Sequence, residues 1–246
     1  MEWHFSLLLL ALTSLAASMS QKKDYLPNVA YISSKELGDF LVADKTTLAY
    51  WEESLNTTNV RTLCGCRTVC WSSRWCVAAS LDTTSDGVLC RLANFTETNL
   101  PQTTRQTNST YIFFLNKAVP HLYTEVEYPE HHIVPKQNLS MEEAKMYCSR
   151  IPGHHLATIK TMTHKKAVER CVMASQTKEL WVDLVAVHRK PQWGDGTPLN
   201  QTLLNKPEVK TNTDHTTYTI SEKNIEIRDP TVEYPFVCQG VLTVLG

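Results

Sequence analysis

Four of the chain's eight cysteines lie within thirteen residues, in the segment CGCRTVCWSSRWC from Cys64 to Cys76. Such a cluster can hold a metal ion, carry out redox chemistry or form crosslinks. The cellular compartment decides among these uses. In an oxidising compartment disulfides are the first interpretation, and zinc bound by thiolates is the minority one. The cellular compartment therefore decides whether these cysteines crosslink the fold.

The first twenty residues indicate export. Phe5 to Ala17 is a nearly unbroken apolar run, with Ser18 and Ser20 placed for cleavage before Gln21. This pattern predicts a signal peptide over residues 1–20. The run is shorter than the roughly 20 residues of a membrane span, and no other stretch comes close. We expect a secreted, extracellular protein with no membrane span.

Export gives meaning to Asn-X-Ser/Thr triplets, which are acceptor sites for N-linked glycans. The chain holds five of them, at Asn56, Asn94, Asn108, Asn138 and Asn200. Each is a candidate surface glycosylation site, and we expect only some of them to be occupied.

Charge and motifs narrow the class of function. The formal net charge is -1 at pH 7, so no overall field attracts nucleic acid or a membrane surface. The chain lacks the sequence patterns of a hydrolase nucleophile elbow, a zinc-protease helix or a phosphate-binding glycine loop. We expect a binding protein, and not an enzyme.

A change of composition near the middle predicts two domains. A Thr/Asn/Gln-rich stretch is followed by Pro120, Pro129 and Pro135, which discourage long helices, so we place a linker or boundary near residues 117–130. The predicted fold class is α+β, with one domain over residues 25–118 and another over residues 119–240.

The first half predicts a short helix followed by three strands. In VRTLCGCRTVC, Cys66 and Cys70 stand four residues apart and share a helix face. The segments WCVAASLD, VLCRLANFT and TYIFFLN have the composition of strands. Bonds from the two helical cysteines to neighbouring strands would hold the helix against a small sheet.

The order of the helix cysteines, the strand at Cys76 and the closing Cys90-Arg91-Leu92 resembles the core of a PAN/apple domain over about 30 residues. The resemblance implies that Cys66 pairs with Cys90 and Cys70 with Cys76. It also implies a module that binds proteins or carbohydrates. The outer disulfide of such domains has no counterpart here.

The second half predicts two helices and several strands. Ser140 and Glu143 form a capping box before the first helix, and a second helix is expected over Thr163–Ser175. ELWVDLVAV has the pattern of a buried strand, QWGDGTPLN of a polar turn, and YPFVCQ of a short strand ending in Cys238.

These landmarks, in this order, resemble a C-type lectin-like domain over residues 119–240. The resemblance implies two helices, two small antiparallel sheets, a long loop region and a disulfide between Cys148 and Cys238. It further implies that Trp193 is a core residue, although a tryptophan beside a polar loop could also stack on a sugar ring.

The calcium site of that family is altered. Calcium takes six to eight oxygen ligands, which the family supplies from a Glu-Pro-Asn or Gln-Pro-Asp loop and a Trp-Asn-Asp strand. The corresponding positions here read Lys206-Pro207-Glu208 and Ile227-Arg228-Asp229. Only Asp229 is retained, with Asn205 and Glu208 as substitutes if the loop shifts. We therefore expect no cofactor and a binding surface that works without calcium.

Three basic residues, Lys165, Lys166 and Arg170, concentrate positive charge on the second predicted helix, with His164 beside them. A solvated helix face is the favoured interpretation. The alternative is an anion patch for sulfated or sialylated glycans or for bacterial surface polymers.

The paired histidines His131-His132 and His154-His155 are interpreted as surface loop residues, because adjacent side chains diverge and do not chelate a metal ion.

Cys64 and Cys171 have no partner within their own halves. They could bond to each other or to a second chain, and our hypothesis is a Cys64–Cys171 bridge between the domains.

Together these features predict a secreted recognition protein that binds glycans or glycoproteins, with innate immunity as its setting. The alternative is an extracellular adhesion or matrix protein that binds other proteins and no sugar.

Overall fold

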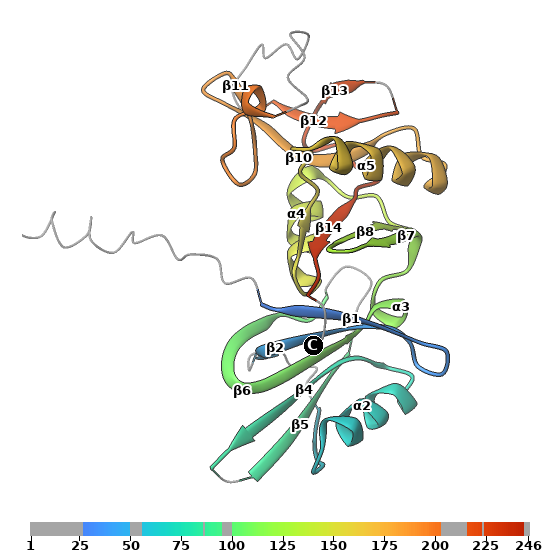
Figure 1. Ribbon diagram of the computed structural model, residues 1–246, viewed down its shortest axis with the longest axis vertical. Helices are drawn as coiled ribbons and strands as arrows, with labels where there is room; N and C mark the ends of the chain where they lie inside the picture. The colour runs from blue at the N-terminus through green and yellow to red at the C-terminus, as the bar shows by residue number, and fades with distance from the viewer. Residues whose placement is uncertain are drawn as a thin grey trace, which may run out of the picture.

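The structure is a computed structural model that describes residues 27–49, 56–85, 87–94, 100–202, 216–222 and 224–243. The predicted signal peptide and the predicted ligand-binding residues Asn205 to Glu208 lie outside these ranges. The first half of the chain contains a six-stranded sheet with helices of 10 and 4 residues, and the second half contains two four-stranded sheets with helices of 10 and 14 residues (Figure 1).

The large sheet is antiparallel, with the order β1-β2-β6-β4-β5-β3. Its strands are β1 Val29–Ser34, β2 Gly38–Leu48, β3 Asn56–Asn59, β4 Cys76–Thr84, β5 Gly87–Asn94 and β6 Thr103–Phe114. The predicted strands β4, β5 and the end of β6 are confirmed. Strands β1, β2 and β3 were not predicted from the sequence.

Both faces of this sheet are apolar, because β2 and β6 carry apolar residues at successive positions. Phe40 pairs with Phe114, and both belong to the buried cluster that also contains the cysteines of helix α2, Leu63–Ser72. The next pair, Leu41 and Phe113, belongs to a different buried cluster on the opposite face. A strand with this pattern needs cover on both sides.

Helix α2 covers the first face and is held there covalently. Thr62 is its N-cap and accepts a hydrogen bond from the backbone N–H of Gly65 at 3.1 Å. Disulfides join Cys66 to Cys90 on β5 and Cys70 to Cys76 on β4. These are the pairings that the PAN/apple resemblance implies, and the resemblance itself stays a prediction.

The C-terminal end of α2 is held by Lys117, which lies on the short helix α3, Leu115–Ala118. Its ammonium group donates hydrogen bonds to the carbonyls of Cys70, Trp71 and Ser73 at 2.9–3.2 Å. These carbonyls belong to the end of a helix, where a positive charge is stabilising. Burial lowers the pKa of Lys117.

The second half contains two four-stranded sheets. The first has the order β7-β8-β14-β9, with β7 His121–Glu127, β8 Glu130–Pro135, β9 His154–Leu156 and β14 Cys238–Val241. The second has the order β11-β10-β12-β13, with β10 Leu180–Val187, β11 Lys190–Trp193, β12 Thr217–Ile220 and β13 Ile225–Arg228.

Helices α4, Met141–Arg150, and α5, Met162–Ser175, pack against these sheets, and a single 3-10 turn, η1, spans Leu199–Gln201. The capping box of Ser140 and Glu143 is present, and the apolar face of α5 is buried as expected. A disulfide joins Cys148 on α4 to Cys238 on β14. The mixed fold with small antiparallel sheets is confirmed.

One local prediction is narrowed and another is wrong. The segment around residues 117–130, predicted to be a linker or a domain boundary, contains β7, which pairs with β8 through backbone hydrogen bonds. It is therefore not a linker, and a boundary there stays a prediction. The last strand begins at Cys238 instead of ending there, because Cys238 to Val241 pair with β8 while Phe236 forms a separate parallel bridge to Trp181.

The two halves share one hydrophobic core. The cluster on the second face of the large sheet contains Val29 and Leu41 together with Ile151 and Trp181 from the second half. The backbone N–H of Thr243 donates to the carbonyl of Val29 at 2.7 Å. The division at residues 118 and 119 stays a prediction, but the core crosses it.

Removal of Cys148–Cys238 should be the most destabilising disulfide loss. It closes a 90-residue separation, whereas Cys70–Cys76 closes 6 residues. The chain-entropy relation gives losses of about 4–5 kcal/mol and about 2 kcal/mol, respectively. Denaturant unfolding of the two double Cys→Ala variants measures both, and equal losses would contradict the loop-length argument.

Gly153→Ala should disturb the contact between the halves. Gly153 has φ +72°, and an added Cβ would lie 2.9 Å from Cγ2 of Val29. Gly196 is a matched control, because its φ is +84° and a Cβ added there would meet nothing within 4 Å. Both substitutions cost about 1–2 kcal/mol for the left-handed backbone. Gly153→Ala should cost about 1–3 kcal/mol more for overpacking.

Thermal unfolding of the two alanine variants gives this difference. Equal melting temperatures would show that Val29 does not pack on Gly153.

Candidate binding surfaces

Arg228, at the end of strand β13, forms an ion pair with Glu179 at the place where metal ligands were considered. The guanidinium of Arg228 donates to the carboxylate of Glu179 through Nε at 2.9 Å and through Nη2 at 3.2 Å. The same carboxylate accepts a hydrogen bond from the hydroxyl of Thr219. These hydrogen bonds to Glu179 raise the pKa of Arg228. The arginine is held in a fixed orientation and its charge is balanced.

Asp229, the retained member of the expected ligand set, is exposed and bonded within its own turn. Its carboxylate accepts from the backbone N–H of Thr231 at 2.9 Å and from the Thr231 hydroxyl at 2.7 Å. These hydrogen bonds lower the pKa of Asp229. The carboxylate therefore has a local structural role at the start of the turn.

The described residues here do not fit calcium. Calcium needs several converging oxygen ligands, and here the guanidinium of Arg228 neutralises Glu179 beside Asp229. Across the described ranges, no group of three or more His, Cys, Asp or Glu side chains is arranged to hold a metal ion.

Residues 227–234, from the end of β13 into the turn that follows, carry both apolar and polar side chains, and we call them the 227–234 surface. Ile227 and Val232 are 42% and 44% exposed, which is high for aliphatic side chains. Arg228 lies 6.0 Å from the ring centre of Tyr234. This surface combines a planar cation, an aromatic ring and the carboxylate of Asp229 with the exposed Val232. Ile227 precedes Arg228 on β13, so its side chain leaves the other face of the strand.

The basic residues of α5 do not form a free anion patch. Arg170 Nε lies 2.7 Å from the carboxylate of Glu125, and its Nη2 donates to Glu127 at 2.6 Å. Lys165 lies 3.4 Å from Glu169. The interaction with Glu125 raises the pKa of Arg170. Lys166 is exposed. Because acidic side chains from β7 and α5 neutralise two of the three cations, the interpretation as a solvated helix face is the better one.

The paired histidines are not surface loop residues, so this prediction is wrong. His131 and His132 lie on β8 and are 0% and 1% exposed, while His154 on β9 is 4% exposed. Strand β14 runs between them, and Gly240 leaves room for the His154 ring, since a Cβ there would lie 2.6 Å from His154 Nε2. Pairing of three strands that are distant in sequence buries these rings.

A continuous chain of hydrogen bonds identifies the protonation state of two of these rings. His154 Nδ1 faces the carbonyl of Pro152 at 2.8 Å and therefore carries a proton. His154 Nε2 lies 3.1 Å from His131 Nδ1, and His131 Nε2 lies 3.0 Å from the Thr124 hydroxyl. Both rings satisfy all these bonds when neutral. Burial lowers the pKa of His131 to about 2 and that of His154 to about 4.

Acid should destabilise the protein through this pair. Both folded-state pKa values lie below the unfolded value of about 6.5, so the unfolded chain binds protons first as the pH falls. The contribution to unfolding free energy is constant above pH 6.5. It should fall below that, by roughly 1.4 kcal/mol per pH unit for each histidine.

The pH range over which stability is lost extends from pH 6.5 down to about 4 for His154 and to a lower pH for His131. Denaturant unfolding at several pH values measures the slope. An unchanged free energy between pH 6.5 and pH 4.5 would contradict the assignment.

Cys64 and Cys171 are both free thiols, so the structure contradicts the proposed bridge. Cys64 is exposed on the first turn of α2, whereas Cys171 is buried in the core of the second half among Val168 and Val172. Burial raises the pKa of Cys171 to about 12. One thiol is on the surface of helix α2 and the other is inside the core of the second half, and the structure shows no bond between them.

Two further predictions concern the surface and the core. All five sequon asparagines are exposed, as glycosylation requires. Trp193 is completely buried in the core of the second half, so the core interpretation is confirmed and it cannot stack on a sugar.

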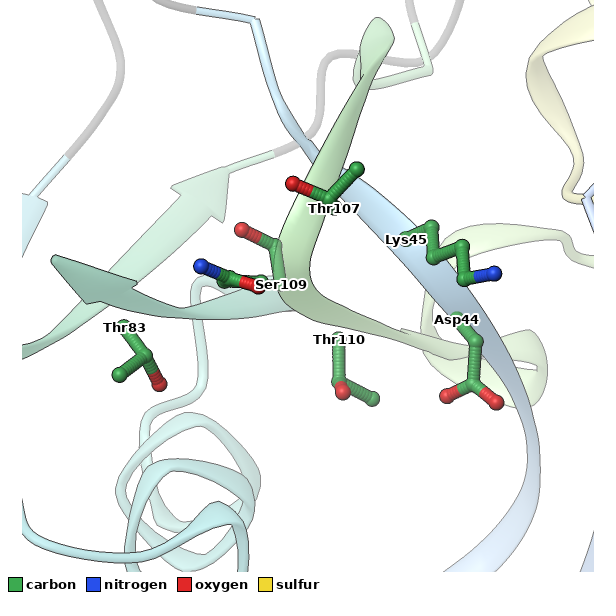
Figure 2. A pocket seen from close by; sticks show the side chains of 7 residues that line it. Asp44, Lys45, Thr83, Thr107, Ser109 and Thr110 are labelled. Carbon is green, nitrogen blue, oxygen red and sulfur yellow. The ribbon is translucent and has the colours of Figure 1, made fainter.

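An open hollow of about 580 Å³ on the large sheet was not predicted from the sequence. Its lining consists of Asp44, Lys45, Thr83, Thr107, Asn108, Ser109 and Thr110 (Figure 2). The residues come from β2, β4 and β6, and only the pairing of these strands brings them together. The glycosylation triplet at Asn108 is the one feature of the sequence analysis that falls among these residues.

Comparisons with known proteins find likeness at the level of structure. No family model matches the sequence, and no curated protein matches it. The natural killer cell receptor Ly49C is 18% identical, with a TM-score of 0.42 over 50% of this chain and 95% of that one. Human lithostathine is 14% identical, with a TM-score of 0.40 over 48% and 88%.

The carbohydrate-recognition domain of the mouse scavenger receptor C-type lectin is 15% identical, with a TM-score of 0.42 over 52% of this chain and 98% of that one. Each of these three likenesses covers about half of this chain. Among the described residues, none of the helices has the length and apolar character needed to span a membrane.

Proposed function

We propose that this chain is a secreted recognition protein that binds glycans or glycoproteins through the 227–234 surface without calcium. The observation that carries the proposal is the ion pair of Arg228 with Glu179, which presents a fixed guanidinium on the strand where the C-type lectin-like resemblance would place metal ligands. Recognition of microbial or host glycans in innate immunity is part of this proposal.

The chemistry of the surface supports such binding. A planar guanidinium can donate paired hydrogen bonds to carboxylate, sulfate or vicinal hydroxyl groups. Its position 6.0 Å from the Tyr234 ring adds a flat face on which an apolar patch of a sugar can lie. The orientation is set before binding, so little conformational entropy is lost when a ligand arrives.

The exposed aliphatic residues favour a second candidate. Ile227 and Val232 are exposed in the same segment as the charged groups, and exposed aliphatic side chains suit contact with a protein better than contact with a sugar. An extracellular adhesion or matrix protein without sugar binding is therefore the alternative.

A glycan array with calcium and with chelator distinguishes these functions. We expect binding that survives the chelator, because the Arg228–Glu179 pair needs no metal ion. Arg228→Ala should weaken it by about tenfold or more, the effect of losing a hydrogen-bonded charge.

The matched control is Arg189→Ala, an exposed arginine in the turn between β10 and β11, at the opposite edge of the same sheet. Loss of binding with chelator would overturn the calcium-independent site. No binding to any glycan would favour the adhesion function.

A further inference from the structure

The hollow on the large sheet arises from unequal strand lengths. Asp44 pairs with Thr110, and the next pair along is Thr46 with Arg105. One residue of β2, Lys45, therefore stands opposite residues 106–109 of β6. Lys45 has φ 54°, a left-handed conformation that bends β2 at this point. The surplus residues of β6 form a bulge that carries Asn108.

The bulge remains anchored to the sheet on its other side. Ser109 pairs with Asp82 on β4 and is 5% exposed, while its neighbour Asn108 is exposed. Asp82 is itself buried and bonded to Arg91 at 2.9 Å. The position of Asn108 at the hollow is therefore set by a buried part of the sheet and not by a loose loop.

The lining of the hollow is polar. It consists of four hydroxyl side chains, the Asn108 amide, the Asp44 carboxylate and the Lys45 ammonium group, with no apolar or aromatic residue. Figure 2 shows Asp44, Thr83 and Thr110 pointing to the same side of the sheet. In the described part of the chain, the buried Ser109 hydroxyl has no hydrogen-bond partner. Such a lining suits a ligand rich in hydroxyl and amide groups, and not an apolar one.

A ligand of that chemistry is attached to the chain itself if the sequon is used. Asn108-Ser109-Thr110 is an N-glycosylation triplet, and all three of its residues line the hollow. A sugar tethered by one side chain has an effective concentration in the millimolar range or above. It would occupy the hollow before any free sugar of comparable affinity.

We propose that Asn108 carries an N-glycan and that its first N-acetylglucosamine lies in this hollow, against Asp44, Thr83 and Thr110. The sugar shields the bulge and lies against its polar side chains. The part of the sheet around the hollow is then covered by the chain's own glycan and is not a site for external glycans. The inference is independent of the 227–234 surface and stands or falls separately from it.

The test begins with the protein secreted from cells that attach high-mannose N-glycans. Glycopeptide mass spectrometry measures occupancy at Asn108. Hydrogen exchange is then compared between two treated forms. One has each glycan trimmed to a single N-acetylglucosamine, and the other has all sugar removed, which converts Asn108 to Asp.

Amides of residues 44–46 and 107–110 should exchange roughly fivefold faster in the sugar-free form, the effect of losing about one net hydrogen bond. Asn108→Asp, which has the same composition at this position, should match the sugar-free form. Amides around Asn200, exposed on η1 outside the hollow, should not differ between the forms.

Two variants separate the hollow from the sequon. Asp44→Ala with Thr83→Val changes the lining, leaves the Asn108 triplet intact and adds no new triplet, so occupancy should stay the same while the protection by the single sugar falls. Thr110→Ser preserves both the triplet and the hydroxyl and should retain occupancy and protection.

Three results would overturn the proposal. The first is an unglycosylated Asn108. The second is equal exchange in the single-sugar and sugar-free forms, which would show that the glycan points into solvent. The third is an unglycosylated Asn108 together with amide hydrogen exchange around the hollow that slows when free N-acetylglucosamine is added. That result would make the hollow a site for external sugar.

Discussion

The large sheet is apolar on both faces, and the rest of the architecture follows from the need to cover it. Antiparallel sheets commonly leave one face in water, but here the neighbouring pairs Phe40–Phe114 and Leu41–Phe113 point to opposite sides, and all four side chains are buried. Helix α2 covers one face, held by two disulfides and by Lys117. The second half covers the other face (Figure 1). The two halves are therefore parts of one packed structure.

Electrostatic pairing decides which surfaces remain available for binding. The cations of α5 that could attract anionic glycans are largely neutralised by Glu125, Glu127 and Glu169. Arg228 is also paired, but its partner Glu179 holds it in place on an exposed strand end next to apolar groups. A charge in a balanced and oriented pair contributes specificity more than raw attraction. The 227–234 surface is the better candidate for this reason.

Local patterns predicted much of the fold. The helices over Leu63–Ser72 and Met141–Arg150 follow from apolar spacing and from capping residues, which act within a few residues of each other. Strand β1 was missed although it forms a local hairpin with β2, whereas β2 and β3 were missed because their other partners, β6 and β5, lie far along the chain. The histidines were misplaced for the same reason, since His131 and His154 are buried only when β14 inserts between β8 and β9.

Composition and spacing predicted helices and short strands in both halves of the chain, because hydrophobic periods and helix caps are local properties. They also marked the cysteines for crosslinking. The resemblance to C-type lectin-like domains implied the small antiparallel sheets and showed that Arg228 does not suit a calcium site. Only the tertiary structure decided that the halves share a core, that Cys64 and Cys171 stay apart, and that Asn108 lies at a polar hollow. Each of these depends on contacts between residues distant in the chain, and no local pattern encodes such distances.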